Sequence, residues 1–355
     1  MSIFDQYFGK QPNKITDYTI PQNLTAREFG KIYVRKTTQK TKVLFTILMP
    51  PQGQNAEGWQ TGIALDASSS MTSSYGRELQ GELPTKVIES YAKKNWITNE
   101  EEDGLCFRIF EKAAVKDALT KGYFKYSKNI VEPLARQFIA YLASNLDVNG
   151  KTTVIYWAGG NGSQYEEIGA IHADECENLT IQGPQKIRFG LSTKLRPAMQ
   201  YYCNHFPNAE RSMYIFITDG YIDDLEEVKH YTTKLAKNIA TNTNKLVKCI
   251  LIGVGDEIDS KQMLDSDNLN TDTNQDIWDY KIAANLRNLV EVFAELVDEN
   301  QIVAPLASIY DSNGQLVKKF TDGLPAKVQV DFPVNTKQFE LEIMEQRIKQ
   351  TLDVS

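Results

Sequence analysis

Apolar strand-like segments alternate with helix-length segments between residues 59 and 300, and this alternation constrains the fold more than any other feature. "TGIALD", "TTVIYWAGG", "SMYIFITDG" and "VKCILIGVG" are short and almost wholly apolar. The segments between them space their apolar residues as a helix does, as in "NIVEPLARQFIAYLASNL", and "KIAANLRNLVEVFAELVDEN" closes the region as a long helix. Strands that are apolar on both faces occur in parallel sheets covered by helices. The pattern therefore predicts an α/β fold with a mostly parallel central sheet and helices on both faces.

The two flanks, residues 1–55 and 301–355, predict β structure. "IYVRKTTQKTKV" predicts two strands around a polar turn, and Asn313-Gly314 predicts a hairpin turn because both residues tolerate positive φ. "EIMEQRIKQTL" predicts a last helix. Neither flank has enough apolar surface to fold alone, so we expect them to pair into one small β-domain, with the domain of residues 56–300 inserted between them. An antiparallel sheet built only from residues after Asn300 would contradict this pairing.

The charge and cysteine content narrow the function and the location. The net charge of -7 and the pI of about 5.3 argue against a nucleic-acid binder and against a polybasic membrane anchor. The N-terminal segment does not read as a signal peptide, and no apolar run reaches the roughly 18 residues of a membrane span. The four cysteines lie far apart, and Cys249 falls in an apolar strand. Reduced thiols predict a cytoplasmic location.

Polar side chains follow three of the predicted strands. Asp66, Ser68 and Ser70 form a D-x-S-x-S pattern directly after the first strand. Thr193 lies in "FGLSTKLRPAM" at a loop-to-helix junction, and Asp219 ends the strand in "FITDG". Because the carboxyl ends of parallel strands meet at one edge of a sheet, we expect these side chains to converge. Hydroxyls and carboxylates suit a hard divalent cation, and an anionic oxygen from outside is a natural further ligand. Because magnesium is abundant in the cytosol, Mg²⁺ is the expected ion, with Ca²⁺ or Mn²⁺ as alternatives.

The order of these motifs resembles the von Willebrand factor A domain and its metal-ion-dependent adhesion site, of the intracellular prokaryotic type. The resemblance implies a Rossmann-like fold. It also implies that Ser68, Ser70 and Thr193 bind the ion directly or through water, whereas Asp66 and Asp219 hold waters or bind at longer range. A Glu or Asp of a partner then completes the shell. The competing interpretation is a serine-rich turn with helix caps at the threonine and the second aspartate.

The resemblance covers residues from Gly58 to Asn300 and implies a binding module rather than an enzyme. Intracellular domains of this family resemble adaptors that dock onto multi-protein machines, including AAA+ ATPases. A protein partner that offers Asp or Glu to the metal is therefore expected. Two alternatives stay open. One is a Mg²⁺-dependent hydrolase of phosphate esters, and the other is a structural component of a larger assembly in which the metal site is a relic.

One departure from the family is that the expected helix does not follow D-x-S-x-S directly. The best candidate, "NIVEPLARQFIAYL", begins only near Asn129. We therefore predict an insertion over about residues 72–126 that stands beside the metal cleft and gates the site or selects the partner. Alternatively, "TKVIESYAKKNW" is the expected helix and "GLCFRIF" the second strand. The strand that lies next to the one ending at Asp66 distinguishes the two alternatives.

Two further features have plain structural interpretations. "WAGGNGSQ" lacks the glycine order of a phosphate-binding loop and predicts a backbone turn near the metal edge. The tandem Asp223 and Asp224 predict the acidic start of a helix, with a minor role for their charge near the metal.

Overall fold

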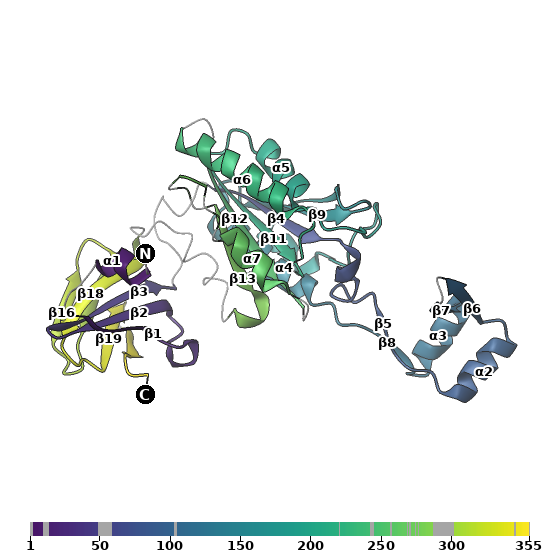
Figure 1. Cartoon of the computed structure of the whole chain (residues 1–355), viewed down its shortest axis with the longest axis horizontal. Helices are drawn as coiled ribbons and strands as arrows, with labels where there is room; N and C mark the ends of the chain where they lie inside the picture. The colour runs from purple at the N-terminus through teal and green to yellow at the C-terminus, as the bar shows by residue number, and fades with distance from the viewer. Residues whose placement is uncertain are drawn as a thin grey trace.

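The chain forms three bodies, shown in Figure 1: a β-body made from both ends of the chain, a central body, and a small lobe on a two-stranded ribbon. The small lobe and its ribbon comprise residues 79–126, and the name lobe covers both. Among the described residues, no helix is both long enough and apolar enough to cross a membrane. The computed structural model describes residues 3–9, 14–48, 59–102, 105–219, 221–241, 245–255, 258–267, 269, 271–273, 275, 277–286, 302–343 and 346–354.

The central body is built on a six-stranded sheet in the order β10-β9-β4-β11-β12-β13. Neighbouring strands from β9 to β13 run parallel, and β10 runs antiparallel at the edge. Side chains along β11 are almost all buried, because both faces of the sheet are covered. The strands are β4 (Trp59–Asp66), β9 (Lys151–Gly159), β10 (Gln164–His172), β11 (Arg211–Thr218), β12 (Leu246–Gly253) and β13 (Trp278–Ile282).

Helices pack on the two faces of this sheet. Ile63 and Leu65 point to the face that carries α4 (Val131–Asn145), and Ala64 points to the face that carries the other two long helices. The helix expected over residues 281–300 falls mostly on residues 287–301, which lie outside the described residues. Its first two residues end β13 instead. The remaining helices are α5 (Leu195–His205), α6 (Leu225–Ala240) and α7 (Ser260–Asp267).

The predicted fold class, a Rossmann-like α/β domain with one small β-domain, is wrong. Of the described residues, 40% lie in strands and 29% in helices. Five of the six described sheets are small and purely antiparallel, and the sixth is mixed because β10 reverses against β9. The apolar runs that predicted a parallel sheet cover only part of the chain. Strands whose burial alternates along the chain, such as Lys327–Pro333 and Gln338–Ile343, contribute to the other sheets, and such strands pair antiparallel.

The β-body contains two four-stranded antiparallel sheets around one core. In the first sheet β18 pairs with β3, so that Val330 lies opposite Val43 and the two flanks share a sheet. The second sheet consists only of residues after Asn300, so the pairing of the flanks is partial. The first sheet holds β1 (Lys14–Thr19), β2 (Phe29–Thr37), β3 (Lys40–Ile47) and β18 (Lys327–Pro333); the second holds β16 (Leu316–Phe320), β15 (Ala307–Tyr310), β19 (Gln338–Ile343) and β20 (Gln346–Thr351).

The helix predicted for "EIMEQRIKQTL" is wrong, because the segment lies in the antiparallel strands β19 and β20. Along β19, Leu341 and Ile343 point into the core with the period of two that is typical of a strand.

The buried Arg35 on β2 binds Asp17 at 2.7 Å and Asp5 at 2.9 Å, which ties the N-terminal helix α1 (Ile3–Phe8) to the sheet. A two-stranded sheet of β14 (Ile302–Ala304) and β17 (Leu324–Pro325) lies in the same body.

The lobe has a small core of its own. Tyr91, Ala114, Ala118 and Phe124 are among its buried residues. β9, and not β7, pairs with β4, while β7 pairs with β6. This pairing fits the alternative in which residues 72–126 are inserted. The elements are β5 (Leu79–Gly81) and β8 (Phe124–Tyr126), which form the ribbon, then α2 (Thr85–Lys93), β6 (Ile97–Glu102), β7 (Leu105–Phe110) and α3 (Lys112–Thr120).

Candidate metal centre

Asp66 is the last residue of β4 and is fully buried. Its Oδ1 accepts a hydrogen bond from the Ser68 amide at 2.7 Å, and its Oδ2 accepts one from the Thr218 hydroxyl at 2.6 Å. Burial raises the pKa of Asp66 to about 7, against the lowering effect of these hydrogen bonds, and the negative charge of Asp219 raises it further.

Two serine hydroxyls stand directly beyond this carboxylate. The Oγ atoms of Ser68 and Ser70 lie 2.9 Å apart. Ser68 is buried whereas Ser70 is exposed, so the pair extends from the buried part of the site to the protein surface. The hydroxyl of the buried Tyr75 donates to the Asp66 carbonyl oxygen at 2.7 Å and fixes the turn that presents both serines.

A second loop is bonded to the serine turn through Gly190. Its amide donates to the Ala67 carbonyl at 2.8 Å, and its carbonyl accepts from the Ser69 amide at 2.8 Å. A Cβ at Gly190 would lie 1.8 Å from the Ala158 carbonyl oxygen, so this approach requires glycine. The loop then carries Thr193 to the same edge of the sheet.

The glycine-rich segment after β9 supports that loop. It forms the turn between β9 and β10, as expected of a backbone turn. The Gly160 carbonyl accepts from the Leu191 amide at 3.1 Å. A Cβ at Gly162 would lie 2.4 Å from the Ser192 carbonyl oxygen. The glycines therefore allow the turn to pack against the loop.

Asp223 connects the Thr193 loop to the loop that follows β11. Its Oδ2 accepts from the Thr193 amide at 2.6 Å and from the Ser192 hydroxyl at 2.8 Å, while its own amide donates to the Thr193 carbonyl at 2.9 Å. Thr193 is only 5% exposed. These three bonds hold the Thr193 loop against Asp223.

The neighbouring Asp224 caps a helix other than the one it precedes. Its Oδ1 accepts from the Leu195 amide at 2.8 Å and its Oδ2 accepts from the Arg196 amide at 3.0 Å, which satisfies the first turn of α5. Burial raises the pKa of Asp224, and these amides lower it. The tandem acids therefore bind the Thr193 loop and the first turn of α5, whereas the sequence predicted an acidic start of α6 and a minor role for their charge near the metal.

Asp219 follows the end of β11 and is half-buried. Its Oδ1 is buried and has no hydrogen-bond partner among the described residues. An unsatisfied carboxylate oxygen close to the buried Asp66 is unfavourable unless a cation or a donor compensates it. Two carboxylates and three hydroxyls are also the donor set that Mg²⁺ prefers. The residues present therefore fit a divalent cation.

The predicted residues come together in part through direct contact and in part through their loops. Asp66, Ser68 and Ser70 form one bonded turn, and the charge of Asp219 acts on Asp66. The capping interpretation is not supported, because Lys194 precedes α5 and Asp224 precedes α6 at the N-cap positions. In the described part of the chain, no group of three or more His, Cys, Asp or Glu side chains could hold a metal, so this site depends on its hydroxyls.

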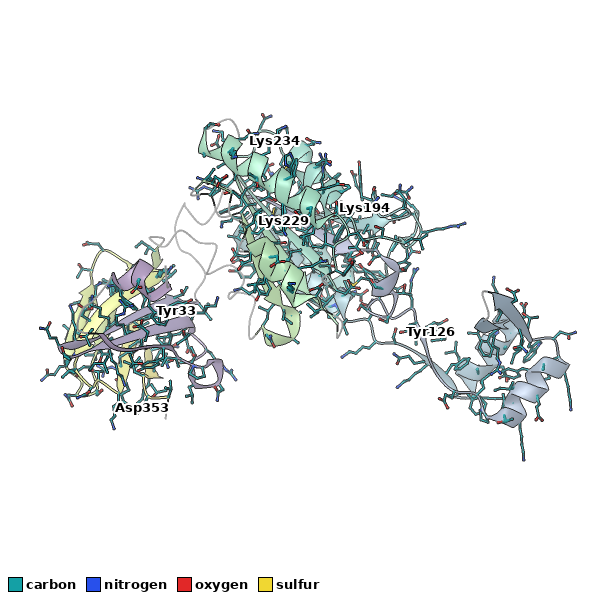
Figure 2. All side chains as sticks on the ribbon, in the orientation of Figure 1. Tyr33, Tyr126, Lys194, Lys229, Lys234 and Asp353 are labelled. Atoms are coloured by element: carbon teal, nitrogen blue, oxygen red, sulfur yellow. The ribbon has the colours of Figure 1, made fainter. Side chains whose placement is uncertain are left out.

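The sequence did not identify every residue that shapes the centre. Thr218, Gly190 and the bonds of Asp223 were missed. The signal for Gly190 was its place at the start of the G-x-S-T segment, and Thr218 lies directly before Asp219 in "FITDG". Figure 2 places Lys194, which follows the candidate ligand Thr193, in the central body.

Comparisons with known proteins do not assign this chain to a family. No family model matches the chain, and no curated protein matches it. Nine chains of solved structures match, among them the PilB minor pilin from Streptococcus sanguinis, with 12% identity and a TM-score of 0.34 over 79% of this chain and 76% of that one. A likeness at this TM-score carries no argument. The resemblance to the von Willebrand factor A domain therefore stays a prediction.

Proposed function

We propose that this chain is a metal-dependent protein-binding module, an adaptor or scaffold without enzymatic activity, that captures an acidic side chain of a partner. Asp66, Ser68, Ser70, Thr193 and Asp219 would hold one Mg²⁺. The observation that carries the proposal is that the buried Oδ1 of Asp219 has no hydrogen-bond partner among the described residues and lies near the fully buried carboxylate of Asp66. Such a pair is stabilised by a divalent cation, and two carboxylates leave the cation able to attract a further anionic oxygen.

Each part of the site has a distinct task in this function. The bound ion supplies a positive attachment point for a carboxylate of the partner. Asp66 and Asp219 supply the negative charge that retains the ion. The exposed Ser70 marks the side from which a partner reaches the site, whereas Ser68 and Thr193 are buried and held by their loops.

The surface around the centre supports a protein partner. Leu191 is 90% exposed and lies two residues before Thr193. Tyr221 is 55% exposed and lies two residues after Asp219. Large apolar side chains on the loops that carry ligands favour contact with another protein. We therefore propose a partner segment in which Asp or Glu stands beside apolar residues.

The identity and setting of the partner are part of the same proposal. The family resemblance favours a component of a multi-protein machine, such as an AAA+ ATPase. A cytoplasmic setting favours Mg²⁺, because magnesium is the more abundant divalent cation there. Ca²⁺ and Mn²⁺ have the same preference for oxygen ligands and are alternatives.

The test is a calorimetric titration of the whole chain with Mg²⁺, followed by partner capture from the native host with and without EDTA. The double variant Asp66→Asn and Ser68→Ala should lose Mg²⁺ binding and partner capture but keep its circular-dichroism spectrum. Ser69→Ala is the matched control, because Ser69 is exposed and stands between the two serine ligands. Capture that persists in EDTA, or Mg²⁺ binding unchanged in the double variant, would refute the proposal.

A further inference from the structure

A groove of about 420 Å³ runs along one side of α3 in the lobe, apart from the candidate metal centre. Phe110, Val115 and Leu119 form its apolar part and are half-buried. The volume is that of a site for one or two large side chains. We call it the α3 groove. Its lining residues are Phe110, Lys112, Val115, Lys116, Leu119, Thr120 and Tyr126.

The α3 groove is separate from the core of the lobe. Ala114 and Ala118 are the fully buried positions of α3, and they pack in the core with Tyr91. Val115 is the next position round the helix and is only half-buried. Tyr126, the last residue of the ribbon strand β8, is 52% exposed and is labelled at the ribbon in Figure 2. This side of α3 thus presents apolar surface that the described structure does not cover.

Two positive charges border this apolar surface. Lys112 and Lys116 lie one helical turn apart and are both exposed. Neither forms an ion pair within the described residues, whereas Lys121, directly after the helix, binds Asp117 at 2.8 Å. An apolar groove with two adjacent unpaired ammonium groups is complementary to a segment that carries both apolar and acidic side chains.

We propose that the α3 groove docks an acidic segment of a partner protein. A large apolar side chain of that segment lies on Phe110 and Val115, and flanking carboxylates pair with the two lysines. This mode of recognition combines an apolar anchor with charge selection, as other peptide-binding grooves do. It uses none of the candidate metal ligands, so docking at the lobe is independent of the divalent cation.

The test is fluorescence anisotropy of labelled peptides titrated with the whole chain in EDTA. One peptide carries a Phe flanked by glutamates, and the matched peptide carries lysines in their place. We expect the acidic peptide to bind at least roughly tenfold more tightly than the basic one, with affinity that falls as salt rises. Equal binding of both peptides, or binding that EDTA abolishes, would overturn the proposal.

Charge reversal locates the binding. Lys112→Glu with Lys116→Glu should reduce acidic-peptide affinity roughly tenfold or more, and it should not unfold α3, because Lys112 is the first residue of the helix and a negative charge is favourable there. The matched control is Lys86→Glu with Lys93→Glu, which makes the same charge change at exposed positions of α2 outside the groove. Equal losses in both double variants would contradict a specific groove.

Two other occupants are distinguished in the same series. Self-association of the wild type in sedimentation velocity that disappears in Lys112→Glu/Lys116→Glu would show that a second copy of this chain occupies the groove. Binding to vesicles that contain phosphatidylserine, without binding to the acidic peptide, would show an anionic lipid surface instead. Either result overturns the proposal of an acidic protein segment.

Discussion

Asp66 ends β4, Asp219 follows the neighbouring parallel strand β11, and the charge of Asp219 adds to the effect of burial on the pKa of Asp66. The two carboxylates come from positions far apart in the chain and meet because their strands run parallel. The nearby charge of Asp219 disfavours ionisation of Asp66. We therefore expect this pair to be the part of the proposed centre that responds both to pH and to a cation.

This pair predicts how the stability of the metal-free protein depends on pH. The pKa of Asp66 is about 7 in the folded chain against 3.8 for the ordinary carboxyl, so the folded state binds more protons than the unfolded state between these values. The free energy of unfolding in EDTA should therefore fall as pH rises through this window, by about 1.4 kcal/mol for each pH unit between the two values. Urea unfolding of the wild type and Asp66→Asn at several pH values measures this slope.

Asp66→Asn should flatten this pH dependence and be more stable than the metal-free wild type above pH 7, because no buried charge then forms. Mg²⁺ should raise the melting temperature of the wild type there and leave that of Asp66→Asn unchanged. A wild type whose stability in EDTA rises with pH over the same window would show that the burial of Asp66 does not control the pH dependence.

Asp223 should control the affinity of the centre for Mg²⁺ through the position of Thr193. Asp223→Ala removes the acceptor of two hydrogen bonds to the Thr193 loop. Hydrogen bonds to a charged group stabilise by about 1.5–3 kcal/mol each, so we expect a weaker Mg²⁺ affinity by roughly tenfold or more. Calorimetry checks this. Asp223→Asn keeps one acceptor oxygen and should restore part of the affinity, whereas equal losses in both variants would argue for a charge effect instead.

Leu191 should matter for the partner and not for the fold. Since its side chain is 90% exposed, Leu191→Ser should change the free energy of unfolding by no more than about 0.5 kcal/mol and leave Mg²⁺ affinity unchanged. Partner capture should nevertheless weaken. Leu306→Ser is the matched control, because Leu306 is 58% exposed in the β-body. If both variants capture the partner as the wild type does, the loop of Leu191 is not part of the contact surface.

Arg35 should be the most sensitive charged residue of the β-body. Arg35→Met removes a buried guanidinium that binds Asp17 through two nitrogens and Asp5 through one, and breaking a buried pair costs about 3–5 kcal/mol. Lys40→Met breaks the exposed pair with Asp331 and should cost less than about 1 kcal/mol. Chemical unfolding compares the two. A similar small cost for both variants would mean that the buried network adds little to stability.

The sequence predicted those parts of the structure whose signal is local. The apolar runs of β4, β9, β11 and β12 identify these segments as strands, whichever strands they pair with. The serine turn after Asp66 is also a local signal, because its residues are contiguous in the chain. The bond from Thr218 to Asp66 joins residues 152 positions apart, and the bond from Thr193 to Asp223 spans 30. Neither contact leaves a periodic pattern, so they could not be predicted from one sequence.

The fold class was wrong for a related reason. Local polarity identifies a strand but does not specify its partner or its direction. The antiparallel edge strand β10 and the hairpin of β19 and β20 depend on turns and packing rather than on apolar periodicity. In "EIMEQRIKQTL" the polar residues satisfied a helical pattern equally well, and only the shared core of the β-body selects the extended form.

The pairing of β3 with β18 has a consequence for the order in which the protein matures during translation. Ribosomal synthesis delivers β3 long before β18, so the hydrogen-bonding groups on that side of β3 face water while the whole central body and lobe emerge. An unprotected edge of this kind invites pairing with other nascent chains. We therefore expect the interval before β18 arrives to be a stage at which this protein is exposed to misassembly.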